Sequence, residues 1–245
     1  MHITITGKTG SGKTTISKLI RDNLGYERYS TGEYQREIAR ELGVDMVEMN
    51  EMMKDNISYD NMIDTTVERV SKEREADDII FDSRMAWHFA GDSFRIFISI
   101  DPDIAGERVF NNPRREEPYE SAAEATEQLV TRGNAENVRF RSIYGVDNYD
   151  YANYDLIIDT SYSDPDDYLD IVKEALAAYT ADRAGYRRRI YISPKSLISI
   201  GSDSEENEDI VIVPYKGKHY VVSGQTKVAR ALERGDKYVI ANIPE

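Results

Sequence analysis

The stretch ITGKTGSGKTT at residues 5–15 contains glycines and polar side chains suited to binding phosphate. Gly7, Gly12, Lys13 and Thr14 satisfy the spacing G-x-x-x-x-G-K-[ST], directly after a strand-like run and before a helix-like run. Glycines here let backbone N–H groups point at phosphate oxygens, and the start of a helix adds a favourable dipole. The pattern predicts a nucleoside triphosphate site formed by Gly7, Thr9, Gly10, Ser11, Gly12, Lys13, Thr14 and Thr15.

Lys13 and Thr14 have distinct expected roles in this site. The Lys13 amine is expected to reach the β and γ phosphates, and the Thr14 hydroxyl to bind Mg²⁺. The motif alone does not choose between ATP and GTP. The sequence contains no Asn-Lys-x-Asp element, which a GTPase uses to read its base.

A group that accepts the phosphoryl must also be held, because transfer needs two clusters of anionic oxygens in line with their charge neutralised. Three segments supply suitable side chains: Thr31 and Arg36 after the second expected strand; Asp82 and Arg84 at the end of the third; and Arg132, Arg139 and Arg141 on a long helix expected at 122–144, with Arg114 and Arg115 before it. The carboxyl ends of strands are where ligands bind in open α/β sheets.

Some of these side chains also have a structural interpretation. Ser30 and Glu33 form a capping-box pattern. Arg132, Glu136 and Arg139 are spaced i, i+4, i+7, which also describes an exposed, salt-bridged helix face worth little stability.

Arg84 favours a functional interpretation, since an arginine at the mouth of a core strand is costly unless it meets an anion. For Asp82 two roles stay open: it orients Mg²⁺-bound water, or it pairs with Lys13.

The elements that must position these residues follow from hydrophobic periodicity and turn residues. Strands are expected at 1–7, 26–30, 77–84, 94–100 and 154–159, and helices at 12–25, 30–43, 45–75, from Pro102, at 122–144 and at 163–179. Strands that alternate with helices predict an α/β domain with a parallel sheet covered on both faces.

The pattern changes after residue 180. Residues 184–245 carry 10 Lys and Arg against 8 Asp and Glu, within a chain of net charge −14. Strands are expected at 190–194, 209–224 as a hairpin turning at 216–218, and 237–243, with a helix at 225–235. This predicts a small α+β module.

The phosphate loop, YSTGEYQREIARELGVDMVEMN, IIFDSRMAW and TRGNAENVRFRSIYGVDNYDYANYDLIIDTS together resemble the archaeal-type cytidylate kinases, within the nucleoside monophosphate kinases. The resemblance covers about 1–178. It implies a P-loop kinase domain over 1–180 with a five-stranded parallel sheet, a monophosphate-binding helical region near 31–75 and an arginine-bearing lid near 112–142. It also implies ATP and Mg²⁺, and a nucleotide acceptor that is most often a pyrimidine such as CMP or dCMP.

By the same resemblance, Arg36 and Arg84 grip the acceptor phosphate, Thr31 lies near the acceptor base, and Arg132 and Arg139 meet the transferring phosphoryl group. The expected catalytic residues are therefore Lys13, Arg84, Arg132 and Arg139.

The chain departs from the family pattern at two positions. Ser83 replaces the usual glycine before the arginine of DSR, and Gly133 replaces the usual acidic residue after the lid arginine. Both positions lie where the resemblance places the acceptor or its cover.

Residues 187–245 resemble a ParB/sulfiredoxin-like domain, whose members bind nucleotides or phosphorylated ligands at the turn after a hairpin. That turn is SGQTK here, with Gln225, Thr226 and Lys227 in place of the usual histidine and arginine residues. A helix N-terminus beside a lysine still suits an anion. An accessory or oligomerising module is the alternative, and the oligomeric state is not indicated.

Composition excludes several classes of function. The net charge of −14 disfavours nucleic-acid binding by the general surface, although residues 187–245 leave room for it. The chain has no cysteine and three scattered histidines, so any metal should be held by oxygen ligands. No apolar run is long enough for a membrane span and no export signal precedes the first strand, so we expect a cytoplasmic protein.

Three functions remain at this stage. The first is an ATP-dependent kinase acting on a nucleoside monophosphate. The second is a kinase acting on a hydroxyl of a modified base or nucleic acid presented by the C-terminal module. The third is a non-catalytic nucleotide-sensing switch, which the lid arginines make the weakest.

Overall fold

The computed structural model describes residues 1–33, 39–40, 43–44, 48, 57–112, 119–200 and 208–244. The chain forms two compact units: residues 1–6 with 13–96, and residues 7–12 with 97–245. Each is described by itself. Strand β4 (Ser93–Ser99) begins in the first unit and ends in the second.

The first unit contains three parallel strands in the order β1, β3, β2. β1 (His2–Gly7) and β2 (Glu27–Ser30) both pair with β3 (Ile79–Asp82), so that Ile5 and Ser30 are both in register with Asp82. β1 and β3 are buried on both faces, including the polar residues His2, Thr4 and Thr6 of β1. The predicted strands at 1–7, 26–30 and 77–84 are confirmed.

Three helices accompany these strands: α1 (Lys13–Leu24), α4 (Ile57–Glu73) and α5 (Ala86–Phe89). α1 buries Ile16 and Ile20, one turn apart, and ends at Gly25, whose φ of 77° suits a helix C-terminus. Val67 of α4, Ala86 of α5 and Ala90 just after it form a cluster with Ile79 and Phe81 of β3. This core fixes the end of β3, where Asp82 lies.

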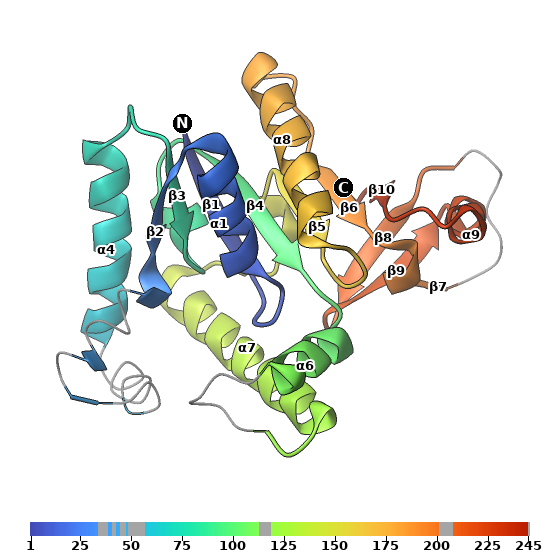
Figure 1. The fold of residues 1–245 in the computed structure, drawn as a ribbon, viewed down its shortest axis with the longest axis horizontal. Coiled ribbons are helices and arrows are strands. Elements are labelled where there is room, and N and C mark those ends of the chain that lie inside the picture. The colour runs from blue at the N-terminus through green and yellow to red at the C-terminus, as the bar shows by residue number, and fades with distance from the viewer. Residues whose placement is uncertain are drawn as a thin grey trace. The chain divides into compact units, whose positions relative to one another are not determined.

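Two helices of the second unit pack closely together, α6 (Pro102–Asn111) and α7 (Ala122–Tyr144) (Figure 1). Asp101 caps α6 by accepting a hydrogen bond from the Asp103 N–H at 2.9 Å, with proline next, as the sequence predicts. A Cβ on Gly106 would lie 1.9 Å from Thr126 Oγ1, so glycine sets the spacing of the two helices. The expected lid thus has α7 as its long helix. Residues 113–118 are outside the described residues.

The rest of the second unit joins the C-terminal segment to the sheet. β5 (Leu156–Asp159), α8 (Pro165–Ala181) and β6 (Arg189–Ile192) form a βαβ unit, because β6 pairs in parallel with β5. β10 (Val239–Ala241) then pairs antiparallel with β6. The sheet therefore continues beyond the five strands that the resemblance implies.

A second, three-stranded sheet has the order β7 (Leu197–Ser199), β9 (Lys218–Ser223), β8 (Val211–Tyr215). The β8–β9 hairpin and the helix α9 (Gln225–Arg234) that follows it confirm the predicted elements. Residues 187–245 belong to the same compact unit as residues 97–186. Their assignment to the ParB/sulfiredoxin-like family stays a prediction.

Buried Asp159 ties the two parts of this unit together. Its carboxylate accepts hydrogen bonds from the Ser161 N–H and hydroxyl, from the Ser193 N–H at 3.3 Å and from the Ser196 hydroxyl. Burial raises the pKa of Asp159, although these hydrogen bonds favour its charged form. In the described part of the chain, no helix combines the length and apolar character that a membrane span needs.

Candidate functional site

The predicted phosphate loop, Gly7–Gly12, takes a shape that depends on glycine. Gly7 has φ of 153°, and a Cβ there would lie 2.2 Å from the carbonyl oxygen of Ile98, so only glycine allows the loop to leave β1 this close to β4. Gly12 has φ of 86° and open space where a Cβ would be. An open backbone turn before a helix is what a phosphate group requires.

Two hydrogen bonds hold the loop, one between its own residues and one from the end of β5. The Ser11 hydroxyl donates to the Lys8 carbonyl at 2.7 Å, which closes the turn. The Thr160 hydroxyl donates to the Ser11 carbonyl at 2.9 Å, so the end of β5 supports the loop.

Helix α1 begins at Lys13, directly after the loop. Thr14 and Thr15 in its first turn are exposed, and Lys13 is partly exposed. The first turn of a helix carries backbone N–H groups without intrahelical partners, and here they follow the open turn at Gly12. A triphosphate site at these residues, with Lys13 at the terminal phosphates and Thr14 at the metal, stays a prediction.

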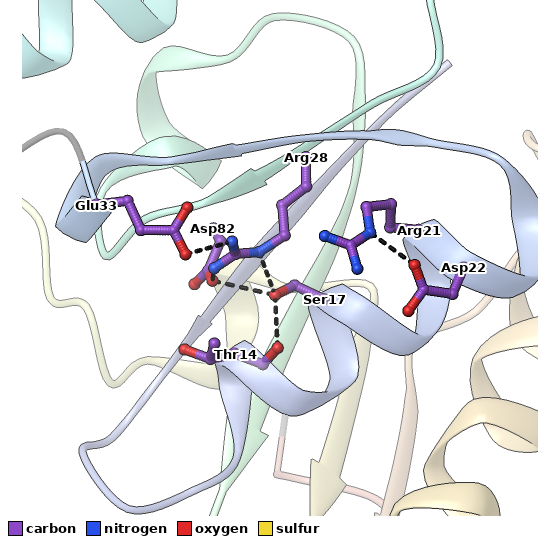
Figure 2. A network of polar contacts seen from close by, with 7 residues as sticks. All are labelled: Thr14, Ser17, Arg21, Asp22, Arg28, Glu33 and Asp82. Atoms are coloured by element: carbon purple, nitrogen blue, oxygen red, sulfur yellow. Dashed lines mark hydrogen bonds and ion pairs between the residues drawn. The ribbon is translucent and has the colours of Figure 1, made fainter.

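Asp82 is bound by a residue that the sequence interpretation missed. The Arg28 Nη2 group of β2 donates to Asp82 Oδ2 at 2.5 Å, and the Ser17 hydroxyl lies 3.1 Å from the same oxygen (Figure 2). Neither of the two roles expected for Asp82 includes this pair. The Arg28 and Asp82 side chains are only 5% and 7% exposed, so this is a buried ion pair.

Arg28 also links Asp82 to helix α1 (Figure 2). Its Nε group donates to Ser17 Oγ at 2.7 Å, and Ser17 Oγ lies 3.1 Å from the Thr14 carbonyl. Arg28 Nη1 donates to Glu33 Oε1 at 2.8 Å. Burial acts to lower the pKa of Arg28, but the carboxylates of Glu33 and Asp82 outweigh it and raise that pKa. The capping-box role that the sequence suggests for Glu33 stays a prediction beside this pair.

The DSR segment follows β3. The Thr6 hydroxyl donates to the carbonyls of Ser83 and Arg84 at 3.1 and 3.3 Å, which fixes the backbone just beyond Asp82. Ser83 is not among the residues with positive φ, so this turn has no conformational need for the glycine that is usual here. Arg84 is partly exposed.

Two further acceptor residues were predicted after β2. Thr31 is 7% exposed, so its side chain belongs to the packed interior at the start of the following helix. Arg36 lies outside the described residues, as do Arg114 and Arg115.

Arg132 and Arg139, which are predicted to belong to a lid, lie on α7. Arg132 Nε donates to Glu136 Oε1 at 3.3 Å, so the i, i+4 pairing considered as a structural alternative is present. The Arg139 guanidinium lies over the Phe140 ring at 5.5 Å. A steric conflict explains why glycine occupies position 133, because a Cβ there would lie 2.6 Å from the Tyr149 hydroxyl oxygen.

Lys8, within the phosphate loop, is a second residue that the sequence interpretation passed over. Its amine donates to the Gly217 carbonyl at 3.3 Å and lies 6.0 Å from the centre of the Tyr149 ring. Burial lowers the pKa of Lys8 to about 8, outweighing the attraction of Asp159 and Asp101. The position of Lys8 inside the phosphate-loop motif was the available signal in the sequence.

Side chains of the SGQTK turn (223–227) interact with other groups of the C-terminal segment. Gln225 is buried and donates to the Ile200 and Val221 carbonyls at 3.1 and 3.4 Å. Lys227 pairs with Asp209 at 3.2 Å. Anion binding at this turn stays a prediction.

A model of the "Cytidylate kinase-like family" matches residues 2–162. A cytidylate kinase of Methanosarcina mazei is 35% identical over 179 residues, which cover 73% of this chain and 97% of the relative. A cytidylate kinase of Natronomonas pharaonis is 33% identical over 184 residues, covering 74% and 92%.

The fold is similar to that of a shikimate kinase from Bacteroides thetaiotaomicron, with a TM-score of 0.51 at 14% identity over 72% of this chain and 98% of that one. This likeness supports the α/β kinase fold, with its mostly parallel sheet and covering helices. The matched residues include the phosphate loop, the DSR segment and α7. The chain belongs to the cytidylate kinase-like family.

Proposed function

We propose that this protein transfers the γ-phosphoryl group of ATP to a nucleoside monophosphate, with CMP or dCMP as the preferred acceptor. The observation that carries the proposal is the glycine-dependent phosphate loop leading into α1, in a chain whose family relatives are cytidylate kinases. The bond between the γ phosphorus and its bridging oxygen breaks. A bond forms from the acceptor phosphate oxygen to the same phosphorus, giving ADP and a nucleoside diphosphate.

Catalysis in this proposal rests on positioning and charge neutralisation. The backbone N–H groups of the loop and the Lys13 amine hold the triphosphate. Arg84, at the end of the strand that carries Asp82, binds the acceptor phosphate. Arg132 and Arg139 of α7 neutralise charge on the transferring group, and Arg132 leaves Glu136 to do so.

Mg²⁺, when bound with ATP, would neutralise phosphate charge, and the Thr14 hydroxyl would hold it. Asp82 fits a supporting role better than that of a direct metal ligand, since Arg28 and Ser17 already engage its Oδ2 atom. We propose that the carboxylate keeps α1 and β2 in place through these contacts.

The test is turnover by the full-length protein with ATP and Mg²⁺ against CMP, dCMP, UMP, dUMP, TMP, AMP and GMP. Lys13→Ala should lower kcat on the order of 100-fold or more, since it removes charge stabilisation from the transferring phosphates. Lys18→Ala, on an exposed position of the same helix, is the matched control and should change little. Arg84→Ala should mainly raise KM for the monophosphate.

Turnover that survives Lys13→Ala would contradict the proposed site. No turnover of any monophosphate, with ATP still bound, would point to the second function considered above, a modified or polymeric acceptor. A preference for AMP or GMP would retain the kinase and reject the pyrimidine assignment.

A further inference from the structure

The turn between β8 and β9 lies against the phosphate loop, although some 200 residues separate them in the chain. The Lys8 amine donates to the Gly217 carbonyl at 3.3 Å. A Cβ on Gly217 would lie 2.7 Å from Lys8 Nζ and 2.9 Å from Pro102 Cγ. A methyl group on Gly217 would therefore require Lys8 and Pro102 to shift.

The turn itself is short and defined. Tyr215 and Lys218 are paired across it, so Lys216 and Gly217 form a two-residue hairpin loop, with φ of 48° and 81°. Positive φ at both central residues is the geometry that matches the twist of paired strands. The direction of the Gly217 carbonyl is consequently fixed by the hairpin.

Two further contacts hold the hairpin in this place. The Lys218 amine pairs with Asp103 at 2.8 Å and Asp101 at 3.2 Å, at the start of α6. The buried His219 Nε2 atom lies 2.7 Å from the hydroxyl of buried Tyr151. Burial and the charge of Lys8 lower the pKa of His219 to about 3, so this ring is neutral at working pH.

α6 also touches the loop. A Cβ on Gly10 would lie 3.2 Å from the Ala105 Cβ atom, one turn beyond the Asp101 cap. The hairpin thus reaches the phosphate loop directly through Lys8 and indirectly through the start of α6.

We infer that the β8–β9 turn of the C-terminal segment is a positioning element of the phosphate loop, and that Gly217 and Lys218 act through Lys8 and α6 to set the loop's affinity for ATP. The family model ends at residue 162, so these residues lie outside the part that matches the family. The inference rests on the proposed function for its ligand. Its physical basis is preorganisation, since a loop already held in the binding conformation loses less freedom when phosphate binds.

The decisive variant is Gly217→Ala, which inserts a methyl group between the turn and Lys8. Gly235→Ala is its matched control: φ at Gly235 is 72°, and a Cβ there meets nothing within 4 Å. Both variants carry the same backbone penalty, whereas only the first collides with the loop. Lys218→Ala, with Lys218→Arg as its conservative partner, tests the second contact.

Two measurements on the full-length protein separate this inference from the proposed function. The first is amide hydrogen exchange of the peptide containing Gly7–Gly12 without nucleotide, and the second is the Kd for ATP by calorimetry. Gly217→Ala should speed exchange in the loop and raise the ATP Kd about ten-fold relative to Gly235→Ala. Small displacements of the groups that bind phosphate are enough to weaken binding by this amount. Lys218→Ala should act in the same direction more weakly, and Lys218→Arg should restore both values.

Equal exchange and equal Kd in Gly217→Ala and Gly235→Ala would overturn the inference. Faster exchange with an unchanged Kd would also overturn it, because the turn would then hold the loop without affecting its ligand. Failure of the unaltered protein to bind ATP would remove the proposed function, and this inference with it.

Discussion

Arg28 in the first unit and Lys8 in the second are both cations shielded from much of the solvent, but their pKa values shift in opposite directions. Arg28 is paired directly with the carboxylates of Asp82 and Glu33, and its pKa is raised. For Lys8, which donates to the Gly217 carbonyl, burial outweighs the attraction of Asp159 and Asp101, and its pKa falls to about 8. The comparison separates a buried cation whose pKa is set by its carboxylate partners from one whose pKa is set by burial.

The largest expected effect is on the paired cation. Arg28→Met should lower the free energy of unfolding by about 3–5 kcal/mol, because it leaves the buried Asp82 carboxylate without its partner. Urea denaturation measures the change. Arg74→Met is the control: Arg74 makes ion pairs with Glu27 and Asp77, all three exposed, and its loss should cost no more than about 1 kcal/mol. Similar losses in both variants would mean that burial does not distinguish the two sites.

The second effect concerns Lys8 and depends on pH. Between about pH 8, its folded value, and 10.5, its ordinary value, the unfolded chain holds the Lys8 proton and the folded chain does not. The free energy of unfolding therefore gains a contribution that rises with pH across this window, at most about 3 kcal/mol. Below pH 8 the full penalty of burying the charge is present.

Urea denaturation of the unaltered protein and of Lys8→Met at several pH values isolates this contribution. The difference in stability, unaltered minus variant, should increase from pH 8 to 10.5. A difference that stays level would show that Lys8 titrates normally, and the contrast with Arg28 would be lost.

The third and smallest effect is at Gly133, which adjoins Tyr149, the residue whose ring faces Lys8. Gly133→Ala should lower stability by about 1–3 kcal/mol, since the new methyl group collides with the Tyr149 hydroxyl. In a Tyr149→Phe background the nearest remaining atom would be 3.8 Å away. There, Gly133→Ala should instead gain about 0.5–1 kcal/mol from helix propensity.

Thermal unfolding measures the stability of four proteins: the unaltered protein, Gly133→Ala, Tyr149→Phe and the double variant. A reversal of sign between the two backgrounds would establish that Tyr149 excludes a side chain at position 133. The same penalty in both would place the conflict elsewhere.

Local patterns predicted most of the elements. The phosphate loop, the Asp101–Pro102 start of α6 and the β8–β9 hairpin depend on residues close together in the chain, and the structure has each of them. Spacing and turn chemistry are sufficient for such features.

What the sequence interpretation missed depends on strand pairing. Arg28 and Asp82 are 54 residues apart and meet because β2 pairs with β3, while Lys8 and Gly217 are 209 apart. A charged residue in a short strand, such as Arg28, suggests a side chain facing solvent, and the neighbouring sequence does not indicate its partner. The pairing of β6 with β5 was missed for the same reason, since a change in composition near residue 184 suggested a boundary there.

The β5–α8–β6 unit has a consequence for any shortened form of this protein. Ending the chain after α8 would leave one side of β5 as a bare edge, with the apolar residues Leu156, Ile157 and Ile158 and a row of unpaired backbone groups. Such edges recruit strands from other molecules and lead to aggregation. We therefore expect a chain shortened after α8 to be less soluble than the full-length protein, because β6 no longer pairs with β5.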